Sequence, residues 1–301
     1  MAVQGTADND GSTMLKPPHT PSDPRRIRTG ATALNTWPTL PEAARPSPEN
    51  IEPPQHARPF VHDDGGTKSL HFTMGELQSR MVLRRPWRLE VDYTRTMMGF
   101  LLFKPAPLHI GMIGLGGGSL AKFCYRQLPA SPMTVLEINP HVIALRREFQ
   151  IPDDDERFRV IMADGALFVQ TEAPRFDVLL IDGFDQDGQP AALCAQRFYD
   201  DCFAALTDGG VLVVNLHYDH PDYPVLAGRI SRSFSGNAVE VLSEEQSNSI
   251  VFASKGQAIS PRRMNLSKSL SGLDEEARLQ IKSELVRIAW QMKTLDDGDC
   301  A

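Results

Sequence analysis

The fold is decided by the stretch Ile110-Gly-Met-Ile-Gly-Leu-Gly-Gly-Gly-Ser119, followed by Val135-Leu-Glu137. A short apolar strand ends in a run of glycines, and a second apolar strand ends in an acid about 20 residues later. Three spaced glycines let backbone N–H groups approach a ligand closely: Gly114, Gly116 and Gly118. Glu137 can hydrogen-bond to both hydroxyls of a ribose. The pattern predicts a nucleoside-binding site on a doubly wound α/β sheet; a tight turn without a ligand is the alternative.

Composition limits the class of protein. With 301 residues and 41% hydrophobic residues, the chain can bury a sizeable core. A formal net charge of −7 indicates no general attraction to nucleic acid or to an anionic membrane, and no apolar run approaches the roughly 20 residues that span a bilayer. The four cysteines form no C-x-x-C pair and no zinc-binding spacing. We therefore expect reduced thiols, no metal and a cytoplasmic location.

The chain divides into four predicted parts. Residues 1–65 are rich in Pro, Ser, Thr and Asp without an apolar period, so we expect a disordered tail. Residues 66–104 predict a small β-hairpin unit and a linking helix. Residues 105–256 alternate between strand and helix patterns and predict a nucleoside-binding, Rossmann-like domain. Residues 257–301 predict a linker and a C-terminal helix.

Apolar periodicity places the individual elements. The hairpin strands are predicted at 70–74 and 79–83, followed by a helix at 89–103. Parallel strands are predicted at 108–113, 133–137, 158–162, 176–181 and 211–215, and an antiparallel pair at 238–242 and 249–253. The remaining helices are predicted at 119–127, 140–149, 195–206, 223–234 and 274–293. Asp208-Gly-Gly210 is predicted to end the helix at 195–206. The expected fold class is α/β: a methyltransferase-like Rossmann fold with a mostly parallel sheet and an antiparallel end strand.

Acidic residues follow the third and fourth parallel strands. Asp164 can accept a hydrogen bond from an adenine amine, and Gly165 leaves room for the ring; a helix N-cap is the alternative role for Asp164. Asp182 and Asp185 emerge from the fourth strand, where an acid can bind an ammonium group and accept its proton as the amine becomes a nucleophile. A solvated turn is the alternative, and it fits Asp182 less well because this residue directly ends a buried strand.

In combination, these motifs resemble the spermidine synthase family, the polyamine aminopropyltransferases. The resemblance covers residues 70–253 and keeps the order and spacing of the motifs. It includes Gln78 in the hairpin unit, the helix start Tyr93-Thr-Arg-Thr-Met-Met98, and the D-x-x-D loop Asp182-Gly-Phe-Asp185. It implies a β-unit before a methyltransferase-like domain, a homodimer, and decarboxylated S-adenosylmethionine as the cofactor.

The resemblance also implies residue roles. Glu137 would hold the ribose and Asp164 the adenine, while Asp182 would act on the attacking amine and Asp185 would help to bind the diamine. The implied cofactor-binding set is Gln78, Gly114, Gly116, Gly118, Glu137, Asp164 and Gly165, and the implied substrate-binding set is Tyr93 and Asp185. The reaction would be attack of a neutral amine on the methylene group beside a sulfonium, so the enzyme positions two reactants and keeps the amine unprotonated.

Two features depart from the family: the D-x-x-D loop lacks the usual Ser/Thr between its acids and the Pro directly after them, and the glycine loop differs at one position that bears on the donor. The family's glycine loop carries an Asp that grips the aminopropyl ammonium of the cofactor, and Gly117 stands there in this chain. A missing charge-assisted hydrogen bond is worth about 1.5–3 kcal/mol, so we expect weaker discrimination against ordinary S-adenosylmethionine. Two further hypotheses follow: an S-adenosylmethionine-dependent methyltransferase, and a non-catalytic nucleoside-binding protein. NAD binding is disfavoured because the glycine spacing is not G-x-G-x-x-G.

Overall fold

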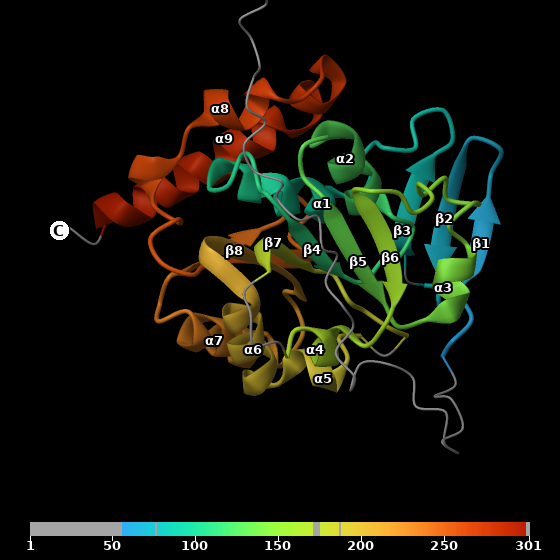
Figure 1. Ribbon diagram of the computed structural model, residues 1–301, viewed down its shortest axis with the longest axis horizontal. Coiled ribbons are helices and arrows are strands. Elements are labelled where there is room, and N and C mark those ends of the chain that lie inside the picture. Colours follow the sequence, from blue (N-terminus) through green and yellow to red (C-terminus); the bar gives the residue numbers. More distant parts are fainter. Residues whose placement is uncertain (1–55, 76, 171–174, 187, 299–301) are drawn as a thin grey trace, which may run out of the picture. The chain divides into compact units, whose positions relative to one another are not determined.

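The computed structural model describes residues 56–75, 77–170, 175–186 and 188–298 (Figure 1). The predicted disordered tail up to residue 55 lies outside them. In the described part of the chain, no helix is both long and apolar enough to cross a membrane.

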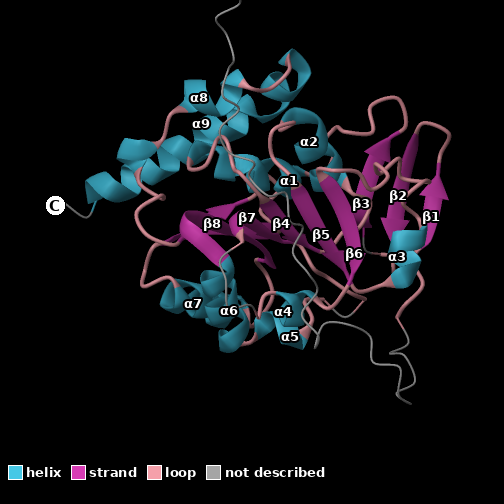
Figure 2. Cartoon of the chain, in the orientation of Figure 1, coloured by secondary structure: helices cyan, strands magenta, loops and turns pink. Residues whose placement is uncertain are grey.

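The central sheet has seven strands in the order β6-β5-β4-β7-β8-β10-β9 (Figure 2). Their bounds are β4 Ile110–Ile113, β5 Met133–Glu137, β6 Phe158–Met162, β7 Phe176–Ile181, β8 Leu206–His217, β9 Ala238–Leu242 and β10 Asn248–Ser254. The first five strands of this order run parallel, and β10 pairs antiparallel with both β8 and β9. The predicted fold class is therefore confirmed, with β10 as the antiparallel strand and β9 at the edge.

Both faces of the sheet are covered, which explains why its central strands are apolar throughout. In β7, Val178 and Leu180 pack into one buried cluster, whereas Leu179 and Ile181 pack into another, as the alternation of side chains along a strand requires. Helices α1 Asp92–Met97, α2 Ser119–Gln127, α8 Leu266–Ser271 and α9 Glu275–Gly298 lie on the first face (Figure 1). Helices α4 Gly165–Phe168, α5 Ala191–Cys194, α6 Gln196–Ala205 and α7 Tyr223–Ser233 lie on the second.

A three-stranded antiparallel sheet precedes this domain, instead of a two-stranded hairpin. Its strands are β1 Phe60–Asp63, β2 Thr67–His71 and β3 Leu77–Val82. Strand β1 falls inside the span predicted to be disordered, so that prediction was wrong for its last residues. The missed signal is a turn: Asp64 Oδ1 accepts hydrogen bonds from the N–H groups of Gly66 (2.9 Å) and Thr67 (2.6 Å), a typical use of Asp beside glycine.

Other predicted elements also differ from the structure; the hairpin strands predicted at 70–74 and 79–83, for example, lie earlier, at Thr67–His71 and Leu77–Val82. The helix predicted at 89–103 is the short α1 followed by a 3-10 helix, η2 Met98–Leu102. There Gly99 packs tightly: a Cβ on it would lie 2.7 Å from both Phe252 and Ile288 side-chain atoms. The helix predicted at 140–149 ends early, as α3 Pro140–Ala144, and Asp208-Gly-Gly210 lies within strand β8 rather than ending a helix. A further 3-10 turn is η3 Pro261–Arg263.

Candidate active site

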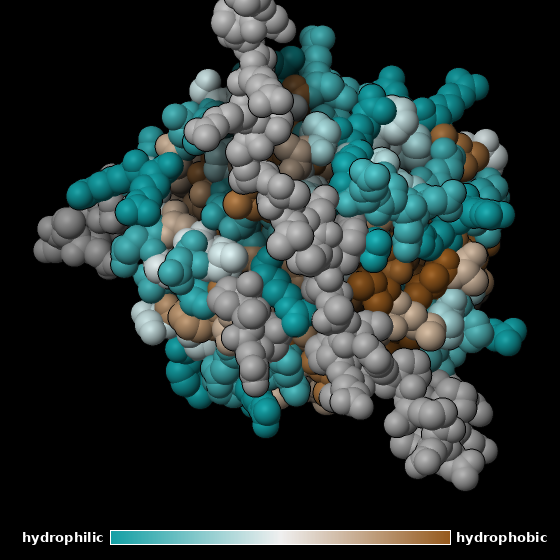
Figure 3. Space-filling view, viewed as in Figure 1, coloured by the Kyte–Doolittle hydropathy of each residue, from teal (hydrophilic) through white to brown (hydrophobic). Residues whose placement is uncertain are grey.

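A cavity of about 370 Å³ opens at the carboxyl ends of β4, β5 and β7. This is the edge where a doubly wound sheet binds its ligand. Every predicted site residue except Gly118 lines it: Gln78, Tyr93, Gly114, Gly116, Glu137, Asp164, Gly165, Asp182 and Asp185. On the face drawn in Figure 3, which is mostly hydrophilic, hydrophobic residues gather near the carboxyl ends of β5 and β6.

The glycine loop between β4 and α2 brings backbone against backbone. A Cβ on Gly114, whose φ is +92°, would lie 2.2 Å from the carbonyl oxygen of Asp182, so only glycine fits there. At Gly116, a Cβ would meet nothing within 4 Å, and the residue borders the cavity. Its bare backbone is thus open to a ligand. Gly118 instead is the N-cap of α2, and a Cβ there would lie 2.5 Å from Ile151, so this glycine lets the start of the helix pack closely.

Glu137 ends β5 and is tied to the glycine loop. Its Oε2 accepts a hydrogen bond from the N–H of Leu115 (2.9 Å), and its Oε1 accepts one from the N–H of Asn139 (2.8 Å). Burial raises the pKa of Glu137, while these backbone donors oppose that rise. The carboxyl group is therefore held in one orientation at the cavity wall, as a group that recognises vicinal hydroxyls needs to be.

Asp164 and Gly165 follow β6, and both have structural duties. Asp164 Oδ1 caps α4 by accepting from the N–H groups of Ala166 (2.8 Å) and Leu167 (3.3 Å). A Cβ on Gly165 would lie 2.5 Å from the Ile113 side chain, so glycine lets α4 approach β4. Asp164 is therefore the N-cap of α4, and it also lines the cavity, so the N-cap role leaves room for a contact with a ligand.

Asp182 ends β7 and receives two side-chain hydrogen bonds. Its Oδ1 accepts from Asn215 Nδ2 (2.9 Å), and its Oδ2 accepts from the Tyr93 hydroxyl (3.2 Å). The residue is partly exposed, toward the cavity, yet the protein encloses its carboxyl group enough for burial to raise the pKa of Asp182. Burial first, and then the Asp182 charge, raise the pKa of Tyr93 well above its usual value. Tyr93 therefore stays protonated and donates, and Asp182 is suited to accept a proton.

Asp185 lies at the rim of the same cavity. Its N–H donates to the carbonyl oxygen of Gly188 (2.8 Å), which closes the loop after β7, and its side chain is exposed. The neighbouring Phe184 lines the cavity and stacks on His217 at a ring distance of 4.5 Å. The deep acid Asp182 and the exposed acid Asp185 thus flank an aromatic wall.

Gly117 stands outside the cavity lining. A Cβ there would lie 2.5 Å from Ser79 Oγ, 2.9 Å from Ser79 Cβ and 3.0 Å from the Phe149 ring. Ser79, on β3, in turn lies 3.3 Å from the Ser119 hydroxyl. An acid at position 117 would therefore have to displace Ser79.

Sequence reasoning missed two polar residues at this edge. Asn215 lies in the last part of β8 and holds Asp182, and Asn139 follows β5 and donates its Nδ2 to the carbonyl oxygen of Ala57 (2.9 Å). Ala57 and His56 line the cavity, so the segment before β1 forms part of its wall. A polar residue near the end of an apolar strand, the signal that identified Asp182, would have identified Asn215. The described residues contain no group of three or more His, Cys, Asp or Glu that could hold a metal.

This arrangement defines a class: a methyltransferase-like α/β protein whose strand ends place carboxylates around one cavity. The family model described as spermine/spermidine synthase domain matches residues 90–224. A polyamine aminopropyltransferase of Neisseria meningitidis serogroup A is 38% identical over 210 residues, which cover 69% of this chain and 79% of that protein. The chain belongs to the spermidine synthase family.

Solved structures agree on the fold. A probable spermidine synthase from Corynebacterium glutamicum has a TM-score of 0.60 at 22% identity, covering 73% of this chain and 88% of that one. A spermidine synthase in complex with the transition-state analogue AdoDATO has a TM-score of 0.54 at 22% identity, covering 76% and 88%. At this identity, both likenesses concern the fold alone.

Proposed function

We propose that this protein transfers an aminopropyl group from decarboxylated S-adenosylmethionine to a small amine in polyamine biosynthesis. The observation that carries the proposal is the convergence of Glu137, Asp164, Asp182 and Asp185 on one cavity. The named relatives are aminopropyltransferases, so methyl transfer and a non-catalytic role are not favoured.

The cavity wall fits a sulfonium nucleoside. Glu137 is oriented to hold ribose hydroxyls, and Gly116 leaves its backbone open to the nucleoside. Asp164 keeps an N-cap with Oδ1, and in this proposal its carboxyl group also accepts from the adenine amine. The donor supplies an activated carbon beside its sulfonium, and the carboxylates supply a cation-binding surface for it.

In the proposed reaction, Asp182 binds and orients the attacking amine, and Asp185 binds the far ammonium of the diamine. The amine nitrogen forms a bond to the methylene carbon beside the sulfonium, and the carbon–sulfur bond breaks with its electron pair going to sulfur. The products are the aminopropylated amine and methylthioadenosine. Before the attack, Asp182 accepts a proton from the bound ammonium and so leaves a neutral amine, while Tyr93 keeps the carboxyl group aimed at the cavity. The product leaves as a secondary ammonium, and Asp182 returns its proton to solvent.

The test is release of methylthioadenosine by the purified protein with putrescine and decarboxylated S-adenosylmethionine. Loss of a general base costs about 100-fold or more in rate, so Asp182→Asn is expected to lower kcat by at least that factor. Asp153→Asn, which changes an exposed acid, is the matched control and is expected to keep full activity. Full activity of Asp182→Asn would overturn the assigned role, and no turnover by the unchanged protein with any diamine would overturn the function.

The choice of donor is a separate point of the proposal. Because residue 117 is glycine, no acid is available there to grip the donor ammonium, and Ser79 fills the space beside it. We therefore expect a weaker preference for the decarboxylated donor than a protein with an acid at position 117 would have. The difference is the worth of one charge-assisted hydrogen bond, about 1.5–3 kcal/mol. Calorimetry with both donors measures that preference. The cytoplasmic location and the homodimer stay predictions, which cell fractionation and light scattering would check.

A further inference from the structure

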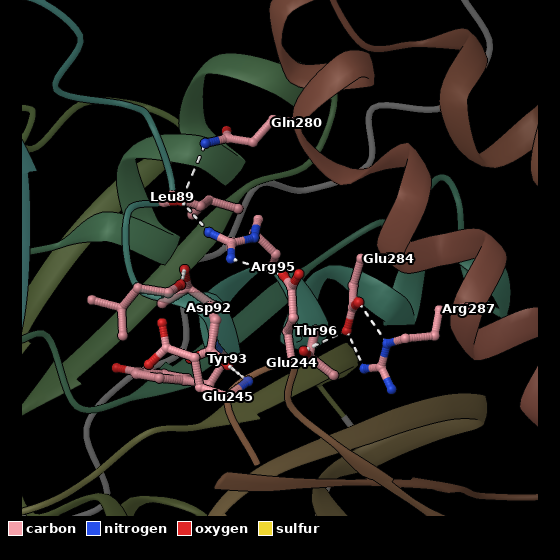
Figure 4. A network of polar contacts seen from close by, with 12 residues as sticks. Leu89, Asp92, Tyr93, Arg95, Thr96, Glu244, Glu245, Gln280, Glu284 and Arg287 are labelled. Atoms are coloured by element: carbon pink, nitrogen blue, oxygen red, sulfur yellow. Dashed lines mark hydrogen bonds and ion pairs between the residues drawn. The ribbon is translucent and has the colours of Figure 1, made fainter. Parts of the chain in front are cut away.

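The turn between β9 and β10, residues 243–247, reaches both side chains that hold Asp182. On one side it leads into Asn248, which contacts Asn215. On the other side it contacts α1, the helix that carries Tyr93 (Figure 4). The two hydrogen-bond donors to Asp182, Asn215 and Tyr93, come from different elements, and both are linked to this turn.

The first connection is a chain of side-chain amides. Ser247 Oγ donates to Asn248 Oδ1 (3.0 Å), Asn248 Nδ2 donates to Asn215 Oδ1 (2.9 Å), and Asn215 Nδ2 donates to Asp182 Oδ1 (2.9 Å). Asn215 and Asn248 are only 2% and 8% exposed. All donors in the chain point toward Asp182, and hydrogen bonds aligned in this way strengthen one another.

The second connection runs through Asp92. The N–H of Glu245 in the turn donates to Asp92 Oδ2 (2.8 Å), and Asp92 Oδ1 accepts from the N–H of Tyr93 (2.7 Å). Asp92 is 3% exposed. Farther along α1, the Thr96 hydroxyl donates to Glu284 of α9 (2.6 Å), so this helix is fastened at both ends (Figure 4). The start of α1, and with it Tyr93, is therefore tied to the turn.

We infer that Asn248 and Asp92 are positioning residues, through which the β9–β10 turn sets the orientation and proton affinity of Asp182. The inference rests on the proposed function. It adds to that function two residues that support Asp182 from outside the cavity, since neither Asn248 nor Asp92 lines it.

The amide chain makes a directional prediction. Without Asn248, Asn215 Oδ1 loses its donor, and the amide is free to turn this oxygen toward Asp182. An acceptor facing a carboxylate favours the protonated acid. Tyr93 is the titratable group in contact with Asp182 from α1, and Asn215 from β8 is neutral. Further titratable residues at this edge are Asp185, His217, Glu137 and Asp164. Loss of Asn248 is therefore expected to move the titration of Asp182 upward.

The experiment follows the Asp182 carboxyl carbon by NMR as pH changes, in protein labelled at aspartate, with Asp182→Asn identifying the signal. We expect Asn248→Ala to raise the midpoint by about one pH unit, a tenfold change in proton affinity. Asp92→Asn tests the second connection: it loosens the hold on Tyr93, so Asp182 loses a donor and its midpoint is expected to rise, whereas loss of the Asp92 charge alone would lower it. Asn237→Ala is the matched control: it removes an Asn side-chain hydrogen bond at the far end of the same hairpin, and its midpoint is expected to stay unchanged.

Two features keep the test decisive. Ser247→Ala alters only the exposed start of the amide chain, so it supplies a folded variant with a smaller shift of the same sign if Asn248→Ala does not fold. An unchanged Asp182 midpoint in folded Asn248→Ala or Ser247→Ala would overturn the inference. The NMR readout does not need turnover, so it separates this inference from the proposed function. Where turnover is measured, the acid limb of kcat/KM is expected to move upward with the midpoint, whereas a general loss of structure would lower activity equally at every pH.

Discussion

Placing an acid at position 117 tests how the closed space beside the glycine loop controls donor choice. In Gly117→Asp, the new Cβ would lie 2.5 Å from Ser79 Oγ and 3.0 Å from the Phe149 ring. Overpacking of this kind costs about 1–3 kcal/mol. Gly117 has no positive φ, so the cost comes from the contacts and not from the backbone. We expect the single variant to be less stable by about that amount and to gain little donor selectivity.

Ser79→Gly removes both close Ser79 contacts, at 2.5 and 2.9 Å, whereas Ser79→Ala removes only the nearer one. Combined with Gly117→Asp, Ser79→Gly is therefore expected to recover stability, and Ser79→Ala is expected to recover part of it. With room for the carboxylate, the gain from a charge-assisted hydrogen bond is about 1.5–3 kcal/mol, or about 10- to 150-fold in preference for decarboxylated S-adenosylmethionine. Urea unfolding gives the coupling free energy of the pair, and calorimetry with the two donors gives the selectivity.

The refuting result is clear for each quantity. If Gly117→Asp alone unfolds at the same urea concentration as the parent and strongly prefers the decarboxylated donor, the space at Ser79 is not closed. If the double variant is stable and shows no added preference, position 117 does not face the donor ammonium.

Three other predictions concern single residues. Gly114→Ala places a Cβ 2.2 Å from the Asp182 carbonyl oxygen at a φ of +92°; we expect a loss of about 3 kcal/mol or more in urea unfolding, and a smaller loss would show that the loop can move away from β7. Glu137→Gln is expected to weaken methylthioadenosine binding by about 1.5–3 kcal/mol in calorimetry, and unchanged affinity would remove Glu137 from the ribose site. Lys122 is 4% exposed, and burial lowers its pKa from 10.5 to about 7. Between those values the unfolded chain binds more protons, so stability is expected to rise with pH over that range and this rise to be missing in Lys122→Met; equal pH profiles of the two proteins would contradict it.

Much of the fold could be predicted from the sequence because several strands of the central sheet are short apolar runs. Strands β5, β6 and β7 have the predicted bounds, since each is a mainly apolar run limited by turn residues. β5 and β7 are buried throughout, as inner parallel strands are, and β6 lies at the edge of the sheet and is partly exposed. Element boundaries failed where a tertiary contact decides them. Helix α1 changes to η2 beside Gly99, which lies against Phe252 from β10 and Ile288 from α9, and no local pattern reveals contacts so distant in sequence.

The site shows the same division. The acids at strand ends could be placed because parallel strands present their carboxyl ends at one edge of a sheet. The reasons for Gly117 and Gly118 could not, because they depend on Ser79 and Ile151, which approach the glycine loop only in the folded chain. Asn215 was missed because it is the only polar residue of the predicted strand 211–215, and an uncharged amide, unlike the acids after the other strands, does not by itself indicate catalysis.

The tether from Asn139 to the Ala57 carbonyl has a practical meaning for anyone who shortens this chain. A version starting at β1 would look complete by its secondary structure, yet it would lack His56 and Ala57 and leave the Asn139 amide without its acceptor. Its cavity would lose part of its wall and be more open to water there. Expression boundaries should therefore be drawn ahead of His56, with any purification tag kept well upstream.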